Sequence, residues 1–258
     1  MKTVFLAWQD PIGRSWHPIG RLDFDDVNYQ FVYIRGAQKA RDEARFEPLV
    51  SFPDLQRIYE SADLFPLFSN RVLSPSRPDY ADYVQWLNVP QDQDDPITLL
   101  SRSGGRRTTD SLEVFPCPEP DENGTYHVHF FAHGLRHLPS ASVERIGQLS
   151  EGERLLLVHD FQNAHDPNAL MLRTNESFEG DLHVVGYCPR YLVSDFFDLR
   201  KQCPDNFQVS VERINPPPAP LQLRLLCSMT ACWPEGNFRP FASDVYEPIP
   251  SGVAAERV

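Results

Sequence analysis

The stretch Val158–Leu170 reads VHDFQNAHDPNAL, a run of polar and turn-forming residues between two apolar segments. Apolar residues typical of strands precede it from Arg154 and follow it to Arg173, so the pattern predicts a polar loop between two β-strands. Asn and Asp side chains hydrogen-bond to the backbone of their own turn, and Pro fixes a backbone angle. We therefore expect this loop to hold its side chains rigidly at the mouth of a β-structure.

Strand patterns surround this loop on both sides. They predict one helix at 190–201 and six strands, at residues 126–132, 154–158, 169–173, 183–187, 207–211 and 221–227. Six strands and one or two helices within about a hundred residues are typical of a closed or nearly closed β-barrel.

The first half of the chain has a different pattern. Three strands at residues 4–8, 20–24 and 29–34 alternate with turn signals and predict an antiparallel sheet. Helical periodicity follows at 54–63 and 79–87. A third helix is expected to begin after Asp95 as N-cap, with Pro96 at its first position, and to stop at Gly104–Gly105. The fold class expected for the whole chain is α+β.

A segment rich in proline and acids, at residues 115–124, separates the two halves. We therefore expect an amino-terminal sheet-and-helix domain of unknown role at 1–118 and a β-barrel domain at 119–235. A proline-rich tail at 236–258 would follow, disordered from 251 onward.

The composition is that of a globular protein, with 24 prolines against 13 glycines among 258 residues. The formal net charge of -12 opposes sequence-independent binding to phosphate backbones and excludes a general nucleic-acid coat protein. No apolar run is long enough to span a bilayer, so no membrane partner is expected. The five cysteines contain no Cys-x-x-Cys pair, which predicts free thiols, no zinc site and a cytoplasmic location.

Four segments in order carry a resemblance to a known family: 134–138 (GLRHL), 149–155 (LSEGERL), the stretch 158–170, and 185–190 (VGYCPR). Their order and spacing resemble the HIRAN domain family over the last 45% of the chain or so. The most specific part is Asn163-x-x-Asp166-x-Asn168-Ala169, followed after a strand by Val185-Gly186-Tyr187.

The resemblance implies an OB-like barrel with a pocket for the last nucleotide of a DNA single strand. By position, Asp166 would accept the 3′-hydroxyl, Asn163 would contact base or sugar, and Arg136 would bind phosphate. The rings of His137, His165 and Tyr187 would stack on bases. The complete set of implied DNA-binding residues is Arg136, His137, Gln162, Asn163, His165, Asp166, Asn168, Tyr187 and Arg190.

Two of these positions depart from the family pattern, because tyrosine is expected where His137 and His165 stand. Imidazole offers less stacking area, and its charge depends on pH. A structural alternative is open for the others: Asp166 and Asn168 are equally suited to Asx turns. Tyr187 is equally suited to the core, and Arg136 to a surface ion pair with Glu151 or Glu153.

A second phosphate site is possible at the end of the third predicted helix. There Ser103-Gly104-Gly105-Arg106-Arg107 could cradle a phosphate through backbone amides and two guanidinium groups. It lacks the Gly-Lys-Ser ending of a P-loop, and an ion pair with Asp110 or Glu113 is the structural alternative for the arginines.

No motif set for catalysis is found, so no enzyme activity and no cofactor are expected. His127, His129, His133 and His137 form a spaced series, but no acid or cysteine stands at a fixed spacing to complete a metal site. The first strands are weakly similar to the front lobe of HipA-like kinases, without their catalytic loop.

The sequence therefore predicts a non-enzymatic DNA-binding module of a bacterial protein that targets or senses single-stranded DNA or DNA 3′ ends in repair or phage defence. The alternative is an adaptor that has lost nucleotide binding and docks a nuclease or helicase subunit, which the net charge favours. The fold-level part of this inference is analogy.

Overall fold

The computed structural model describes residues 2–90, 92–164, 166–175, 182–236 and 238–249, and the backbone of Glu256–Arg257. The chain divides into two compact units. The first contains Met1–Val84, Val89–Cys117 and Phe241–Val258, and the second contains Gln85–Asn88 and Pro118–Pro240. One crossing between the units thus falls inside the proline-rich segment at 115–124.

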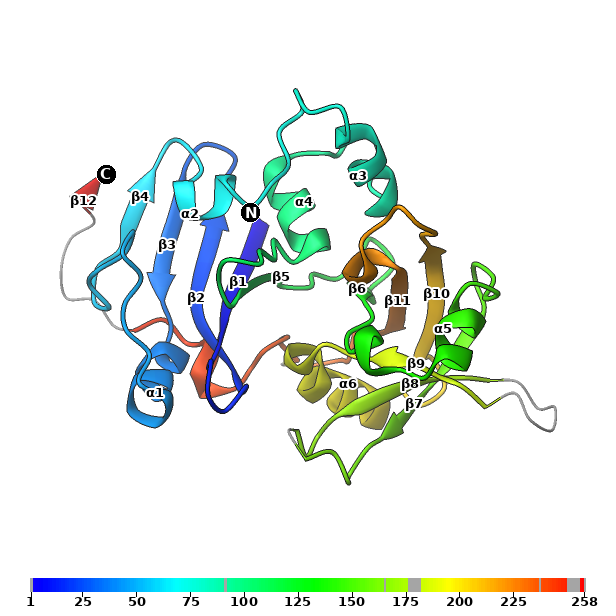
Figure 1. The fold of residues 1–258 in the computed structure, drawn as a ribbon. Coiled ribbons are helices and arrows are strands. Elements are labelled where there is room, and N and C mark those ends of the chain that lie inside the picture. Colours follow the sequence, from blue (N-terminus) through cyan, green and yellow to red (C-terminus); the bar gives the residue numbers. More distant parts are fainter. Residues whose placement is uncertain are drawn as a thin grey trace. The chain divides into compact units, whose positions relative to one another are not determined.

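A six-stranded sheet forms the first unit, in the order β12-β4-β3-β2-β1-β5 (Figure 1). Its strands are β1 (Lys2–Gln9), β2 (Trp16–Phe24), β3 (Tyr29–Tyr33), β4 (Tyr59–Ser61), β5 (Leu112–Pro116) and β12 (Glu256–Arg257). β1, β2 and β3 form the antiparallel meander that the sequence predicts. The helices before β5 are α1 (Arg35–Ala44), α2 (Pro66–Ser69), α3 (Tyr80–Trp86) and α4 (Pro96–Ser103).

Aromatic side chains pack on both faces of this sheet. Phe31 of β3 stacks on Phe52 with 4.0 Å between ring centroids, within a core that is closed to solvent. Phe5 of β1 packs against Phe241, with 5.3 Å between centroids. Part of the expected tail at 236–258 is therefore packed into the first unit, while residues 250–255 and 258 lie outside the described residues.

The prediction of a helix at residues 54–63 is wrong. Asp54 starts a turn instead, because its carboxylate accepts the backbone N–H of Gln56 at 2.8 Å. The Tyr59 hydroxyl accepts the N–H of Asp54 at 2.8 Å, and Tyr59 itself pairs with Phe31 as part of β4. An Asx turn and a strand pairing thus override a helical periodicity.

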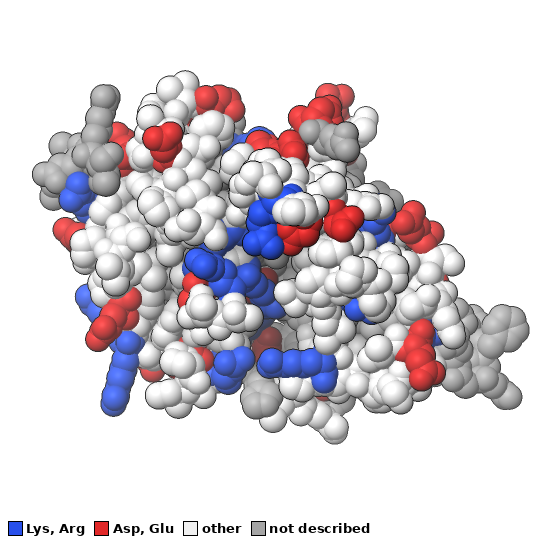
Figure 2. All heavy atoms as spheres, turned by 45° about the horizontal axis from the view of Figure 1, so that its top comes forward, with Lys and Arg blue, Asp and Glu red and all other residues white. Residues whose placement is uncertain are grey.

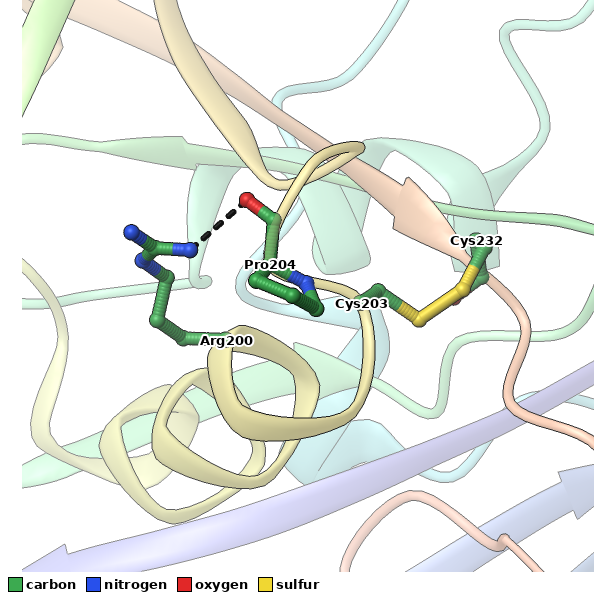
Figure 3. Close-up of a disulfide and its surroundings, with 4 residues drawn as sticks. All are labelled: Arg200, Cys203, Pro204 and Cys232. Atoms are coloured by element: carbon green, nitrogen blue, oxygen red, sulfur yellow. Dashed lines mark hydrogen bonds between the residues drawn. A yellow bond between two sulfur atoms is a disulfide. The ribbon is translucent and has the colours of Figure 1, made fainter.

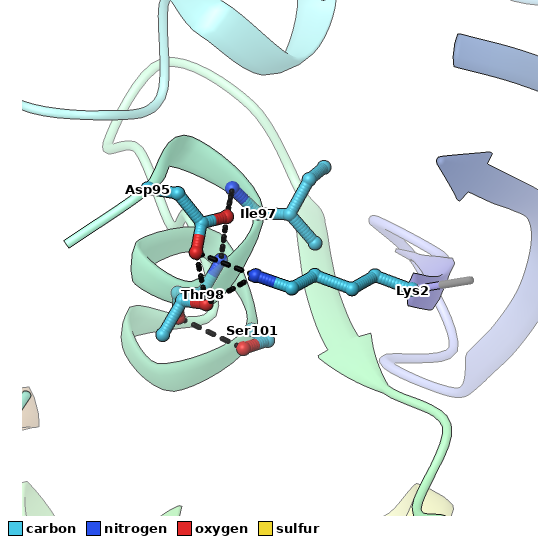
Figure 4. Close-up of polar contacts among 5 residues, drawn as sticks. All are labelled: Lys2, Asp95, Ile97, Thr98 and Ser101. Atoms are coloured by element: carbon cyan, nitrogen blue, oxygen red, sulfur yellow. Dashed lines mark hydrogen bonds and ion pairs between the residues drawn. The ribbon is translucent and has the colours of Figure 1, made fainter. Parts of the chain in front are cut away.

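Helix α4 begins and ends where the sequence predicts. The Asp95 carboxylate accepts the N–H groups of Ile97 and Thr98, each at 3.1 Å, and Gly104 ends the helix with a positive φ of 75°. Lys2 of β1 donates to the same carboxylate at 2.6 Å (Figure 4). The cap therefore also joins the helix to the first strand.

Replacing Asp95 by alanine should lower the free energy of unfolding of the first unit by about 1–2 kcal/mol, the usual cost of losing an N-cap. Burial raises the pKa of the Asp95 carboxyl, but hydrogen bonds from Lys2 and Thr98 outweigh it and hold the pKa below its usual value. The charged form is thus the stabilising one, so its contribution is complete above about pH 4 and is lost as pH falls through the lowered pKa.

Urea unfolding of wild type and Asp95→Ala, followed by tryptophan fluorescence at pH 7 and at pH 3, measures this difference. The difference in free energy of unfolding between wild type and variant should be smaller at pH 3 than at pH 7. A difference that stays constant or increases on acidification would contradict the role of the charged carboxylate.

A second six-stranded sheet, antiparallel throughout, forms the second unit in the order β6-β11-β10-β7-β8-β9. Its strands are β6 (Thr125–Phe131), β7 (Arg154–His159), β8 (Leu170–Thr174), β9 (Val184–Tyr187), β10 (Gln208–Ile214) and β11 (Leu225–Cys232). Just beyond β6, His133 exchanges both backbone hydrogen bonds with Tyr187 of β9, at 2.9 and 3.0 Å. The sheet thus curls until its two edges meet at this one bridge.

The helical elements of this unit are η1 (Leu135–His137), α5 (Ser140–Ile146), α6 (Arg190–Gln202) and η2 (Leu221–Leu223). The α+β class and the curled six-stranded sheet confirm the sequence prediction. The last strand is shifted, however: β11 begins at Leu225, because residues 221–223 form a 3₁₀ turn after Pro220.

The prediction that all five cysteines are free is wrong. Cys203, at the end of α6, forms a disulfide with Cys232, at the end of β11 (Figure 3). Cys117, Cys188 and Cys227 do not take part in this disulfide. The paired cysteines are 29 positions apart, and no motif in this segment would have revealed the pairing.

Among the residues that the structure describes, every helix is too short or too polar to span a membrane.

Candidate nucleic-acid interface

The loop between β7 and β8 is closed by backbone hydrogen bonds. The N–H of Asp160 donates to the carbonyl of Ala169 at 2.8 Å, directly after the last ladder pair of the two strands. Inside the loop, Asn163 N–H donates to Asp160 and Ala169 N–H donates to Asp166. The His159 ring reaches across to the carbonyl of Pro167 at 2.8 Å. The predicted loop between two strands is therefore present, and hydrogen bonds within it close it.

Side chains of the loop also form turns within it. Asn163 Oδ1 accepts the N–H of Asp166 at 3.1 Å, and Asp166 Oδ1 accepts the N–H of Asn168 at 3.1 Å. Both are Asx-type contacts, so the structural alternative given for Asp166 holds, and Asn163 has the same role. One oxygen of Asp166, Oδ2, does not take part in these turns.

Asp166 Oδ2 faces Arg190, the first residue of α6, with 3.7 Å to the guanidinium Nε. This distance is longer than a charge-assisted hydrogen bond, so the pair attracts without saturating the oxygen. The Asp166 side chain is 16% exposed and that of Arg190 is 39% exposed. A carboxylate oxygen and a guanidinium group thus stand side by side at a partly open position.

Tyr187 of β9 anchors the other side of the loop. Its hydroxyl donates to Asp160 Oδ2 at 3.2 Å, and Asn163 Nδ2 donates to the same oxygen at 3.2 Å. Burial and the Asp160 carboxylate raise the pKa of Tyr187, which keeps the phenol a neutral donor. Asp160 was not predicted as a site residue. The signal that could have revealed it was an acid at the first position after a strand.

Arg136 and His137 lie in η1, which follows Gly134. A side chain at Gly134 would come within 3.1 Å of the Tyr187 ring, so this glycine lets η1 start against Tyr187. Arg136 Nε donates to His137 Nε2 at 2.9 Å, and both residues are exposed. Glu153, one of the two acids considered as ion-pair partners of Arg136, accepts from Arg145 at 2.7 Å.

The structure therefore joins five positions by direct contacts: Asp160, Asn163, Asp166, Tyr187 and Arg190. Gln162 and Asn168 are exposed on the same loop. His165, one of the predicted stacking residues, lies outside the described residues.

These contacts lie within the part of the chain that a family model matches. Residues 125–231 match the HIRAN domain family. The match begins at the first residue of β6 and ends within β11, so the HIRAN domain comprises all six strands of the second unit. A HIRAN domain suggests DNA binding.

The crystal structure of a protein from Lactobacillus plantarum is similar at 19% sequence identity and a TM-score of 0.30, covering 42% of this chain and 99% of that chain. No curated protein matches the chain.

The possible second phosphate site lies outside the HIRAN domain. Arg106 donates to the buried Glu113 at 2.6 Å, and its guanidinium lies over the Trp16 ring at 5.6 Å from the centroid. Arg106 thus pairs with Glu113, one of the two acids expected as the structural alternative, whereas the other, Asp110, pairs with Arg71. Arg107 is exposed.

Histidines of the HIRAN domain gather on the β6 face. The rings of His127 and His129 lie 4.3 Å apart, His127 contacts Ser228 at 2.8 Å, and His129 lies 3.6 Å from Glu212. Within the described part of the chain, no group of three or more His, Cys, Asp or Glu residues could hold a metal ion.

Charged side chains of both signs are scattered over the face of the molecule drawn in Figure 2. On the face drawn in Figure 2, lysines and arginines form small groups among acidic and uncharged side chains. With a net charge of -12, such a surface favours local contacts to a few phosphates over binding along a continuous basic surface.

Proposed function

We propose that the HIRAN domain of this protein binds the 3′ end of a DNA single strand, and that the chain acts as a targeting or sensing module without catalytic activity of its own. The observation that carries the proposal is the Asp166 carboxylate oxygen beside the Arg190 guanidinium, 3.7 Å apart at the edge of a loop that its own hydrogen bonds close. A strand end presents the complementary pair, a hydroxyl donor and a phosphate acceptor.

Each group has a distinct part in this proposal. The 3′-hydroxyl donates to Asp166 Oδ2, the oxygen that the Asx turn does not use. Arg190 binds the last phosphate, because a guanidinium donates to two phosphate oxygens at once. Tyr187 offers a partly exposed ring for a base, held in place through its hydroxyl bond to Asp160. Arg136, His137 and the exposed Gln162 and Asn168 line the approach.

The proposal extends to a setting by analogy alone. A chain with an end-reading domain would bring partners to breaks or single-stranded regions, in bacterial DNA repair or phage defence, inside the cytoplasm. Nuclease or helicase subunits are the partners that such a module would serve.

A second candidate function is an adaptor whose HIRAN domain has lost nucleotide binding. Two observations favour it: the net charge of -12, and the engagement of Asn163 and Asp166 in turns of their own loop. An acidic surface would then dock a partner protein instead of DNA.

A circular single strand tests end recognition, because it has every feature of a linear strand except an end. Fluorescence anisotropy with the full chain should give at least roughly tenfold tighter binding to the linear strand, the discrimination of one lost charge-assisted contact. Equal binding to both strands would overturn end recognition, and binding to neither would favour the adaptor.

A further inference from the structure

A groove opens beside α6 in the HIRAN domain, apart from the contacts of Asp166 with Arg190. Its volume is about 300 Å³, and it lies between β7 and α6. Its floor is apolar, formed by Leu155 and Leu157 of β7 with Phe196 of α6 and the nearby Phe207. Leu155 and Phe196 are fully buried, so the groove rests on the core of the domain.

Aromatic rings stand at its rim and continue toward the loop. Phe197 of α6 lines the groove and is 42% exposed. The His159 ring, also in the lining, lies 5.7 Å from that of Phe197 and 6.2 Å from that of Phe161, which is 76% exposed. His159 in turn contacts the carbonyl of Pro167 inside the loop. Three rings therefore connect the groove with the loop that carries Asp166.

Both charged residues of the lining are arginines. Arg154 begins β7 and is exposed, and Arg200 lies in the last turn of α6. Arg200 Nη1 donates to the carbonyl of Pro204 at 2.7 Å, which fixes the guanidinium at this end of the helix (Figure 3). Apolar planar walls with cations at the edge match a ligand that has flat rings and negative charge.

A nucleotide strand combines these two properties. Exposed aromatic rings stack on bases of any sequence, and arginines contact the phosphates between them. β7 extends over six residues from Arg154 to His159, about 16 Å at the usual rise of a strand. Such a span accommodates more than one nucleotide between the loop and the far end of the groove.

We propose that this groove receives an upstream base of the same strand whose 3′ end the loop holds. The inference rests on the proposed function and adds a second contact region to it. Phe197 and His159 stack on the base, while Arg154 and Arg200 bind neighbouring phosphates. Affinity should therefore rise with strand length beyond the terminal nucleotides.

The test compares two oligothymidylates with a 3′-hydroxyl, of two and of ten nucleotides, in competition anisotropy with the full chain. Wild type should bind the longer strand at least roughly tenfold more tightly, the usual gain from one stacked base. Phe197→Ala and the double variant Arg154→Ala/Arg200→Ala should lose most of this gain and leave the affinity for the shorter strand unchanged. Lys201→Ala, an exposed cation on the same helix, is the matched control.

Two results would overturn the inference. Either wild type binds the ten-nucleotide strand no more tightly than the two-nucleotide strand, or all groove variants keep the increase in affinity with strand length. Phe197→Trp guards against a folding defect, since it keeps a ring at the rim and should keep the gain. Thymidine monophosphate serves as a further competitor for the bound labelled strand. If it displaces this strand as well as the ten-nucleotide oligothymidylate does, the groove holds a free nucleotide, and its assignment to an upstream base of a strand is wrong. Equal binding of circular and linear strands would overturn end recognition alone, whereas loss of the length gain would overturn the groove alone, so the two proposals fail separately.

Discussion

Replacing Gly186 by alanine is expected to destabilise the HIRAN domain by about 3 kcal/mol. Gly186 has a φ of +147°, and an added Cβ would lie 2.8 Å from the Cβ of Ala132 and 3.2 Å from the carbonyl oxygen of His133. Backbone strain and overpacking each cost roughly 1–3 kcal/mol. The substitution therefore strains the backbone beside Tyr187, at the bridge where the two edges of the sheet meet. Denaturant unfolding of the full chain measures it.

Gly152→Ala is the matched control for this substitution. Gly152 also has a positive φ, +81°, but an added Cβ would meet nothing within 4 Å. Only the conformational cost of roughly 1 kcal/mol remains there. If Gly186→Ala were no more destabilising than Gly152→Ala, the close contacts at the bridge would not be the reason that residue 186 must lack a side chain.

Elements with local signals were predictable from the sequence. Asp95, Pro96 and Gly104 fix both ends of α4 through contacts within the helix itself, so the sequence determines them directly. The loop at 160–168 follows from the same logic, because Asn163 and Asp166 bond to backbone groups two or three residues away.

Elements that depend on distant neighbours were missed. Helix α1 buries only Gly36, Ala37 and Ala40, and such small residues give no hydrophobic periodicity. They are small because the helix packs tightly on β2: a Cβ at Gly36 would overlap the carbonyl oxygen of Pro18. The Cys203–Cys232 disulfide likewise depends on the approach of α6 to the end of β11.

In the candidate site, too, local features were predictable and contacts between distant residues were not. Family resemblance located Asp166, Tyr187 and Arg190, but not the contacts that join them. The pairing of Asp166 with Arg190 and the shared role of Asp160 depend on how β9 and α6 pack beside the loop. No periodicity along the chain encodes such contacts, so the sequence indicated the residues and left the geometry open.

The second large effect is expected at Asp166. Its carboxylate accepts a hydrogen bond from a 3′-hydroxyl and repels a 3′-phosphate, so wild type should prefer the hydroxyl end by about 10- to 100-fold. Asp166→Asn keeps an oxygen for the N–H of Asn168 but removes the charge, so the loop should remain folded. The preference should fall to about threefold or less. Glu122→Gln, which removes an exposed charge elsewhere in the same unit, should leave it intact.

Anisotropy titration of the wild-type chain with one labelled single strand, ending either in a 3′-hydroxyl or in a 3′-phosphate, tests end recognition most directly. Tighter binding of the hydroxyl strand, by tenfold or more, is the predicted result. Equal affinity for the two strands, or tighter binding of the phosphate strand, would contradict a carboxylate that reads the end of the DNA.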